Sequence, residues 1–309
     1  RSTNGTFYRG HRDPDFEIAA GDVFEVTRRV ALLAVDERLE ILRRRLLWAL
    51  GLRNHAAADR AIETIAANDP LLLVGPRDCE QFAIAQEIHR RSPYNDRELV
   101  VAPARFGKRA DQDVLLDRAI RGTIYLDLMG ATPPLPHHFV ASAFARSRLI
   151  VAATSEDSAR EALDTFASRL RSIRLATPAE RPGDIPRLLE ALVIQEHERR
   201  LLDKTRPPPG ELLPLAAIGE ENLAALEHQP WPGHFADLRR QVPRFHALLT
   251  NRLRLRATSR ALGLKSVSSL IDALDRIGIH IKAVDDDETA IETAGDDDER
   301  PTPPGTPTR

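Results

Sequence analysis

The chain has 309 residues, of which 42% are hydrophobic and 29% charged, and its formal net charge is −2. This composition is typical of a soluble protein of two or three globular domains, and it excludes a polybasic, histone-like protein. A single cysteine excludes internal disulfides and four-cysteine zinc sites, and no apolar run is long enough to span a membrane, so we expect a reducing, cytoplasmic location.

The first 35 residues predict a small β domain. Asn4-Gly5 is a hairpin-type turn sequence, and Val23–Val26 alternates as a half-buried strand does. Residues 36–69 predict linker helices instead, because leucines recur there at three- and four-residue spacing. The sequence Asn68-Asp69-Pro70 ends this helical stretch.

Residues 70–178 alternate between predicted strands and helices. The predicted strands are Leu71–Val74, Leu99–Ala102, Thr123–Leu128 and Leu149–Ala153, and the predicted helices are Phe82–Arg90, Val114–Arg121 and Phe139–Arg146. Such alternation favours a parallel α/β sheet covered by helices. After Pro182 only helices are predicted, at about 184–201, 208–227, 234–252, 257–262 and 266–277.

The tail, residues 284–309, has a different composition from the rest of the chain. It carries nine acidic residues against two arginines, which gives it a net charge of −7 and leaves +5 on residues 1–283. Its end is proline-rich, and it has few apolar side chains to bury. We therefore expect the tail to be disordered.

Five stretches occur in the order found in one bacterial family. They are Gly75–Phe82 after a strand, Gly122–Asp127, Arg148–Thr154, Glu180–Pro186 and Trp231–Gly233. Together they resemble the Walker A, Walker B, sensor I and lid motifs of the AAA+ domain in sigma-54-dependent transcriptional activators. The resemblance implies a P-loop-like α/β subdomain over residues 70–178 and a helical lid over 179–250.

The residues that this family uses for ATP hydrolysis are largely replaced. Gln81 stands in place of the Walker A lysine, Leu128 of the Walker B glutamate, Ser155 of the sensor asparagine and Ala236 of the lid arginine. Asp78 and Glu80 replace loop glycines, and carboxylates there repel a triphosphate. Gly75 and Asp127 are kept as vestigial nucleotide-binding positions. We expect no cofactor and no ATPase activity, with residual ATP or ADP binding and slow hydrolysis as the alternatives.

The sigma-54-contacting loop of the family is also missing. Residues 103–121 are too few for the excursion that bears its G-A-F-T-G-A motif, and that motif is absent from the chain. We therefore expect no remodelling of sigma-54 polymerase by the usual route.

The N-terminal residues resemble the second half of a forkhead-associated (FHA) β-sandwich. Ser2–Phe7 and Gly21–Phe24 carry the resemblance, which implies that Thr3 and Asn4 help to bind a phosphothreonine peptide. Acids follow Thr289 and Thr293 at three residues, a spacing that some such domains accept, so a phosphorylated tail is one candidate ligand beside a partner protein. A generic hairpin turn and a merely solvated tail remain the alternatives.

Residues 251–283 resemble the Fis-type helix-turn-helix of the same activators. The resemblance makes residues of the second helix the DNA contacts, namely Lys265, Ser266, Ser268, Ser269 and Arg276. Asp272 and Asp275 stand where basic residues are usual, so a dimerising or structural remnant is the alternative.

These observations predict a multidomain transcriptional regulator that does not hydrolyse ATP. We expect phosphothreonine-dependent control through residues 1–35, DNA binding through residues 251–283, and homo-oligomers or co-assembly with AAA+ relatives. The competing interpretation is a catalytically inactive protein-interaction scaffold without DNA binding.

Overall fold

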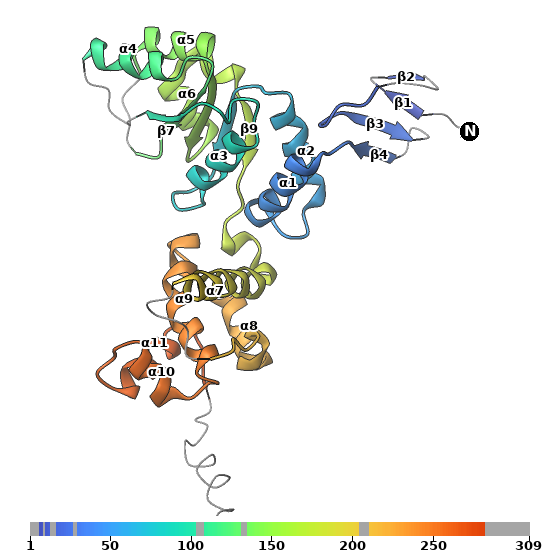
Figure 1. The fold of residues 1–309 in the computed structure, drawn as a ribbon. Helices are drawn as coiled ribbons and strands as arrows, with labels where there is room; N and C mark the ends of the chain where they lie inside the picture. The colour runs from blue at the N-terminus through green and yellow to red at the C-terminus, as the bar shows by residue number, and fades with distance from the viewer. Residues whose placement is uncertain are drawn as a thin grey trace, which may run out of the picture. The chain divides into compact units, whose positions relative to one another are not determined.

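The computed structural model describes residues 6–8, 10–12, 17–26, 30–102, 108–130, 135–203 and 210–281. The chain divides into two compact units (Figure 1). The first comprises Arg1–Ala191 with Glu227–Gln241, and the second comprises Leu192–Leu226 with Val242–Arg309. Within the described residues, no helix is long and apolar enough to cross a membrane.

The first unit begins with a small antiparallel sheet. Its strands are β1 (Thr6–Tyr8), β2 (His11–Arg12), β3 (Val23–Val26) and β4 (Val30–Leu33), in the order β2-β1-β3-β4. A turn at Gly21 precedes β3. Gly21 has φ 97°, and a Cβ at this position would lie 2.1 Å from the Cβ of Ala66, so this turn requires glycine. Thr3 and Asn4 lie outside the described residues.

Two helices follow, within the stretch predicted to hold linker helices. They are α1 (Glu37–Leu50) and α2 (His55–Ala66). Gly51 ends α1 with φ 118°, and the Asn54 side chain begins α2 by accepting a hydrogen bond from the backbone N–H of Ala57. The break therefore comes from a helix-ending glycine and a new N-cap.

A five-stranded parallel sheet forms the centre of the first unit. Its strands are β5 (Leu71–Val74), β6 (Leu99–Ala102), β7 (Thr123–Asp127), β8 (Arg148–Ala153) and β9 (Arg171–Arg174), in the order β6-β7-β8-β5-β9. The parallel sheet and its first four strands are confirmed within a residue or two. The prediction omits β9, because this edge strand reads Arg-Ser-Ile-Arg and buries only Ile173.

Helices and connecting turns complete the α/β part. They are α3 (Gln81–Arg90), α4 (Arg109–Arg118), α5 (His137–Arg146), α6 (Glu156–Leu163), and the 3₁₀ turns η1 (Asp164–Arg169), η2 (Pro178–Glu180) and η3 (Pro182–Asp184). Side chains alternate across the sheet, so Leu71 and Leu73 face one hydrophobic cluster and Leu72 faces another.

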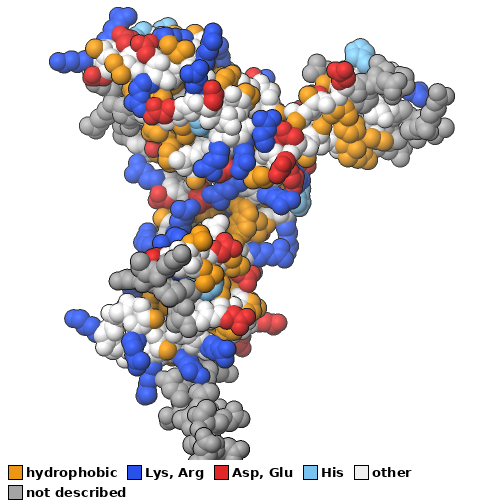
Figure 2. All heavy atoms as spheres, viewed as in Figure 1, with side chains coloured by type: hydrophobic (Ala, Val, Ile, Leu, Met, Phe, Trp, Pro, Cys, Tyr) orange, Lys and Arg blue, Asp and Glu red, His pale blue; other side chains and the backbone are white. Residues whose placement is uncertain are grey.

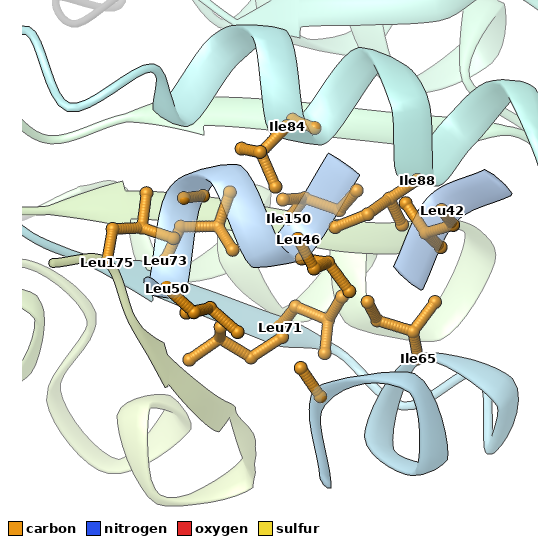
Figure 3. Packing of buried hydrophobic residues seen from close by; sticks show 14 of the residues in the cluster. Leu42, Leu46, Leu50, Ile65, Leu71, Leu73, Ile84, Ile88, Ile150 and Leu175 are labelled. Atoms are coloured by element: carbon orange, nitrogen blue, oxygen red, sulfur yellow. The ribbon is translucent and has the colours of Figure 1, made fainter. Parts of the chain in front are cut away.

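The first of these clusters joins α1, α2 and α3 to the sheet. Figure 3 shows Leu42 and Leu46 of α1 beside Leu71 of β5 and Ile84 and Ile88 of α3. All of these side chains are fully buried, and each burial stabilises the fold by about 1.5–3 kcal/mol. This packing fixes the start of α3, and with it the loop that precedes α3.

Helices and a 3₁₀ turn are the regular elements of the described residues after Asp184. They are α7 (Ile185–Leu202), the 3₁₀ turn η4 (Leu215–Ile218), α8 (Glu220–His228), α9 (His234–Thr250), α10 (Leu255–Ala261) and α11 (Val267–Asp275). The long helix predicted at 208–227 is wrong over residues 210–219, which hold only η4. Pro214 precedes η4, and Gly219, with φ 91°, separates η4 from α8.

Basic and acidic side chains are interleaved on the surface that Figure 2 shows. The same view shows hydrophobic side chains gathered on the N-terminal sheet, where Val30 and Leu32 are exposed. Neither unit presents a continuous basic face in this view.

Candidate functional site

The candidate site lies where parallel strands end. In open α/β sheets, ligands bind at the carboxyl ends of the strands. The segment Gly75–Gln81, called here the phosphate-loop segment, follows β5 and leads into α3, and Asp127 ends β7. Both border a cavity of about 570 Å³, which is lined by Arg77, Asp78, Glu80, Gln81, Phe82, Ala83, Tyr125, Asp127, Met129, Phe235, Ala236 and Arg239.

The backbone of this segment keeps conformations that suit glycine. Asp78 has φ 67° and Glu80 has φ 66°, and both are positions where the resembled family has glycine. Left-handed backbone costs a non-glycine residue about 1–2 kcal/mol. The segment therefore has the backbone of a glycine-type loop with acidic side chains at two of its positions, and other contacts must stabilise it.

Gln81 ties the two ends of the segment together. Its side chain is 5% exposed, and its Nε2 donates hydrogen bonds to the carbonyl oxygens of Gly75 at 3.1 Å and Pro76 at 2.7 Å. The amide that stands in place of the lysine is thus committed to the loop's own backbone. It supplies no positive charge for a phosphate.

Glu80 is the most strongly paired residue of the segment. Its side chain is 7% exposed and forms ion pairs with Arg45 of α1, at 2.9 Å, and with Arg239 of α9. Charge-assisted bonds of this kind are about twice as strong as neutral ones. A carboxylate of the protein therefore satisfies two arginines beside the phosphate-loop segment. Sequence reasoning missed both partners, which lie 35 and 159 positions from Glu80 and carry no local motif.

Asp127 also has an internal partner. Its Oδ1 accepts a hydrogen bond from the backbone N–H of Met129 at 2.8 Å. Arg77 donates to the carbonyl oxygen of Met129 at 3.2 Å, so the Walker B-like strand end is linked to the phosphate-loop segment. Within the described residues, no group of three or more His, Cys, Asp or Glu side chains is placed to hold a metal ion.

Cys79 is a poor nucleophile. Burial raises the pKa of its thiol to about 11, an effect that Arg181 partly opposes and that neighbouring acids reinforce. Burial also lowers the pKa of the Arg181 guanidinium, which lies 5.2 Å from the ring of Phe235.

The other positions that the resemblance aligns with catalytic residues have local structural roles. Leu128 is buried in the second hydrophobic cluster, and Ser155 caps α6 by accepting a hydrogen bond from the backbone N–H of Ser158 at 3.0 Å. Ala236 lines the cavity of the candidate site. None of these side chains supplies the charged group that the resembled family has there.

The predicted DNA-contact residues fall into two groups. α10 and α11 pack against each other across a turn in which Gly263 has φ 66°. Ser266 caps α11 through the backbone N–H of Ser269, and the two hydroxyl oxygens lie 3.0 Å apart, so both side chains form local hydrogen bonds although both residues are exposed. Lys265 and Ser268 are exposed.

Arg276 and the neighbouring charges give this helix pair a mixed surface. The Nε of Arg276 donates to the carbonyl oxygen of Asp272 at 3.1 Å. Asp272 and Asp275 are exposed on α11, and Asp275 lies 3.0 Å from the ring Nδ1 of His280. Exposed arginines before and along α10 supply the opposite charge, namely Arg252, Arg256 and Arg260.

The chain has distant structural relatives. No protein-family model and no curated protein matches the sequence. Among solved structures it is similar to NtrX from Brucella abortus in complex with ATP, with 17% identity, a TM-score of 0.45, and coverage of 78% of this chain and 73% of NtrX. It is also similar to the Holliday junction branch migration motor RuvB of Thermotoga maritima, with 16% identity, a TM-score of 0.45, and coverage of 80% and 72%.

Proposed function

We propose that this chain is a transcriptional regulator related to sigma-54 activators that works without ATP hydrolysis. The observation that supports the absence of ATP hydrolysis is the Glu80 ion-pair cluster: the protein's own carboxylate binds Arg45 and Arg239 beside the phosphate-loop segment. With the Gln81 amide bound to the loop backbone, this amide and the two arginines already have partners within the protein. The regulatory role rests on the resemblance to sigma-54 activators.

Electrostatics argue against a triphosphate at this site. Asp78, Glu80 and Asp127 line the cavity together with two arginines, and one of these, Arg239, is paired to Glu80. Each like-charge contact at about 4 Å costs roughly 4 kcal/mol at an effective dielectric constant near 20. A nucleotide bound here would be repelled by these carboxylates, and its binding would also have to break the Glu80 ion pairs. The proposed role for the α/β part is therefore that of a scaffold.

DNA binding through α10 and α11 is the output that we propose. Exposed Lys265 lies in the turn before α11, and Arg256 and Arg260 are exposed on α10. Lysine and arginine side chains in this position suit contacts to phosphates. Ser266 and Ser269 are better assigned to helix capping than to base contacts, because their side chains bond each other.

Control by phosphothreonine recognition is a further part of the proposal. It rests on the resemblance at Thr3 and Asn4, with a partner protein or the phosphorylated tail as the ligand. Assembly into homo-oligomers, or with AAA+ relatives that hydrolyse ATP, would supply the remodelling activity that this chain lacks.

A scaffold without DNA binding is the second candidate function. The exposed carboxylates of Asp272 and Asp275 on α11 favour it, because they repel DNA phosphates.

The two candidates are separated by DNA capture. The full chain and a chain ending at Ala283 would be incubated with fragmented genomic DNA at two salt concentrations, and the retained fragments sequenced. Enrichment of particular sites supports the regulator, and enrichment only by the shortened chain adds autoinhibition by the tail. No enrichment by either folded protein would establish the scaffold instead. In parallel, sustained turnover of magnesium-ATP would contradict the absence of hydrolysis.

A further inference from the structure

A second cavity of the first unit is lined by arginines. Its volume is about 920 Å³, and its walls come from α2, the edge strand β9 and the turns η2 and η3. Four arginines line it, namely Arg53, Arg60, Arg174 and Arg181. It shares no lining residue with the cavity at the phosphate-loop segment. The two cavities are therefore separate sites.

Arg181 is buried with unused hydrogen-bond donors. It is 9% exposed, and its Nη2 donates to the carbonyl oxygen of Ala176 at 3.2 Å. Its Nε and Nη1 form no hydrogen bond, and the nearest carboxylate oxygen, on Asp184, is 3.8 Å from Nη1. A buried donor without an acceptor is costly. The same guanidinium lines the cavity, so its positive charge acts on a ligand there.

The remaining arginines leave positive charge available. Arg53 and Arg60 are exposed at the rim and form no ion pair with any described residue. Arg174 is paired to Glu180, and Asp184 is the other acid of the lining. Four arginines against two acids leave a net charge of +2 on the cavity wall. Arginines grouped in this way recognise phosphate oxygens through paired N–H groups.

The size and the apolar part of the cavity narrow the class of ligand. Leu50 and Ile173 are buried side chains in its wall, and Ala57 and Ala61 of α2 lie beside them. The volume lies within the range of small-molecule sites, about 300–1,000 Å³, and far exceeds what one phosphate ion fills. We propose that this cavity binds a small organic molecule with two or more phosphate groups, held by Arg53, Arg60 and Arg181. This ligand would act on the protein independently of the phosphate-loop segment.

Binding of inorganic pyrophosphate to the full chain tests this site. Isothermal titration calorimetry at fixed ionic strength should show saturable binding with one site per chain. The double variant Arg53→Gln, Arg60→Gln should weaken binding at least about tenfold. Each arginine that no longer pairs with a phosphate group should lower the affinity by a factor of at least about three. Arg109→Gln, at an exposed arginine on α4, is the matched control and should bind as the wild type does.

A second variant tests the cavity while keeping every arginine. A Cβ at Gly183 meets no atom within 4 Å, so Gly183→Glu adds a carboxylate to the cavity wall at a position with open space for its Cβ. It should also weaken binding about tenfold or more through charge repulsion. Arg77→Gln, in the phosphate-loop segment, should leave the affinity unchanged. Absence of binding by the wild type, equal binding by all variants, or loss of binding in Arg77→Gln would each overturn the proposal.

Discussion

The phosphate-loop segment and the α10–α11 pair treat their polar side chains in opposite ways. In the first, Gln81 and Glu80 turn inward, onto the loop backbone and two arginines. In the second, Lys265 and Arg256 are exposed. Polar groups that are bonded within the protein contribute to its stability and cannot also bind a ligand. Exposed polar groups contribute little to stability and remain available to bind one. Substitutions should therefore affect folding at the first region and binding at the second.

Glu80→Ala should have the largest effect on stability. It removes a nearly buried carboxylate from two arginines and keeps the left-handed backbone, so we expect the free energy of unfolding to fall by about 1–3 kcal/mol. Glu80→Gly should cost less, because glycine relieves the backbone strain. Chemical denaturation measures both.

The matched control for this prediction is Glu98→Ala. Glu98 pairs with Arg118 on the surface, where both side chains are about half exposed, so its loss should change stability by less than about 0.5 kcal/mol. Equal effects at Glu80 and Glu98 would mean that the Glu80 cluster is an ordinary surface pair.

The second unit has an inward polar pair that acid should break. The Nδ1 of His197 lies 3.2 Å from the Nε2 of His246, so these two nitrogens share one hydrogen. Burial, with Arg200 and His197 beside it, lowers the pKa of His246 to about 4, although Glu196 opposes this. Between about pH 6.5 and 4 the unfolded chain then binds more protons than the folded one. The free energy of unfolding should therefore decrease, by up to about 2 kcal/mol, as the pH is lowered through this range.

Denaturation at a series of pH values measures this loss. His246→Gln should remove most of the pH dependence between about pH 6.5 and 4.5, above the range in which the carboxylates titrate. An unchanged slope in the variant would show that His246 is not the group responsible.

The sequence predicts most of the strands and helices, but few of the polar contacts that form inside the protein. Leu71–Val74 and its parallel neighbours could be predicted, because a strand that is buried on both faces appears in the sequence as a short run of apolar residues. The edge strand β9 has one buried residue, Ile173, and so no such pattern. The partners of Glu80 come together only through the packing of α1 and α9 on the loop, and no local spacing encodes that.

The capping serine of α11 should show a smaller effect on stability. Ser266→Ala removes the acceptor for the backbone N–H of Ser269 and should cost about 1 kcal/mol. Ser268→Ala is the matched control on the same helix and should change stability little, since Ser268 is exposed. An equal loss of stability in Ser268→Ala and Ser266→Ala would contradict the capping role of Ser266.

Lys265→Gln should leave stability unchanged and weaken DNA binding modestly. Removing one phosphate contact should reduce the slope of log affinity against log salt concentration by about 1, equally for all DNA sequences. Fluorescence anisotropy at several salt concentrations measures this slope. A slope identical to that of the wild type would remove Lys265 from the DNA contacts.

The most direct test of the filled phosphate-loop segment is nucleotide affinity. Magnesium-ATP would be titrated into the chain carrying Arg53→Gln and Arg60→Gln, so that the arginine-lined cavity contributes little. The same chain with Asp78→Gly, Glu80→Gly and Gln81→Lys would be titrated beside it. We expect no saturable binding before these three changes and clear binding after them, because they remove two carboxylates and restore glycines and a lysine. Tight binding before the changes, or after Gln81→Lys alone, would contradict the claim that Glu80 and Gln81 occupy the site.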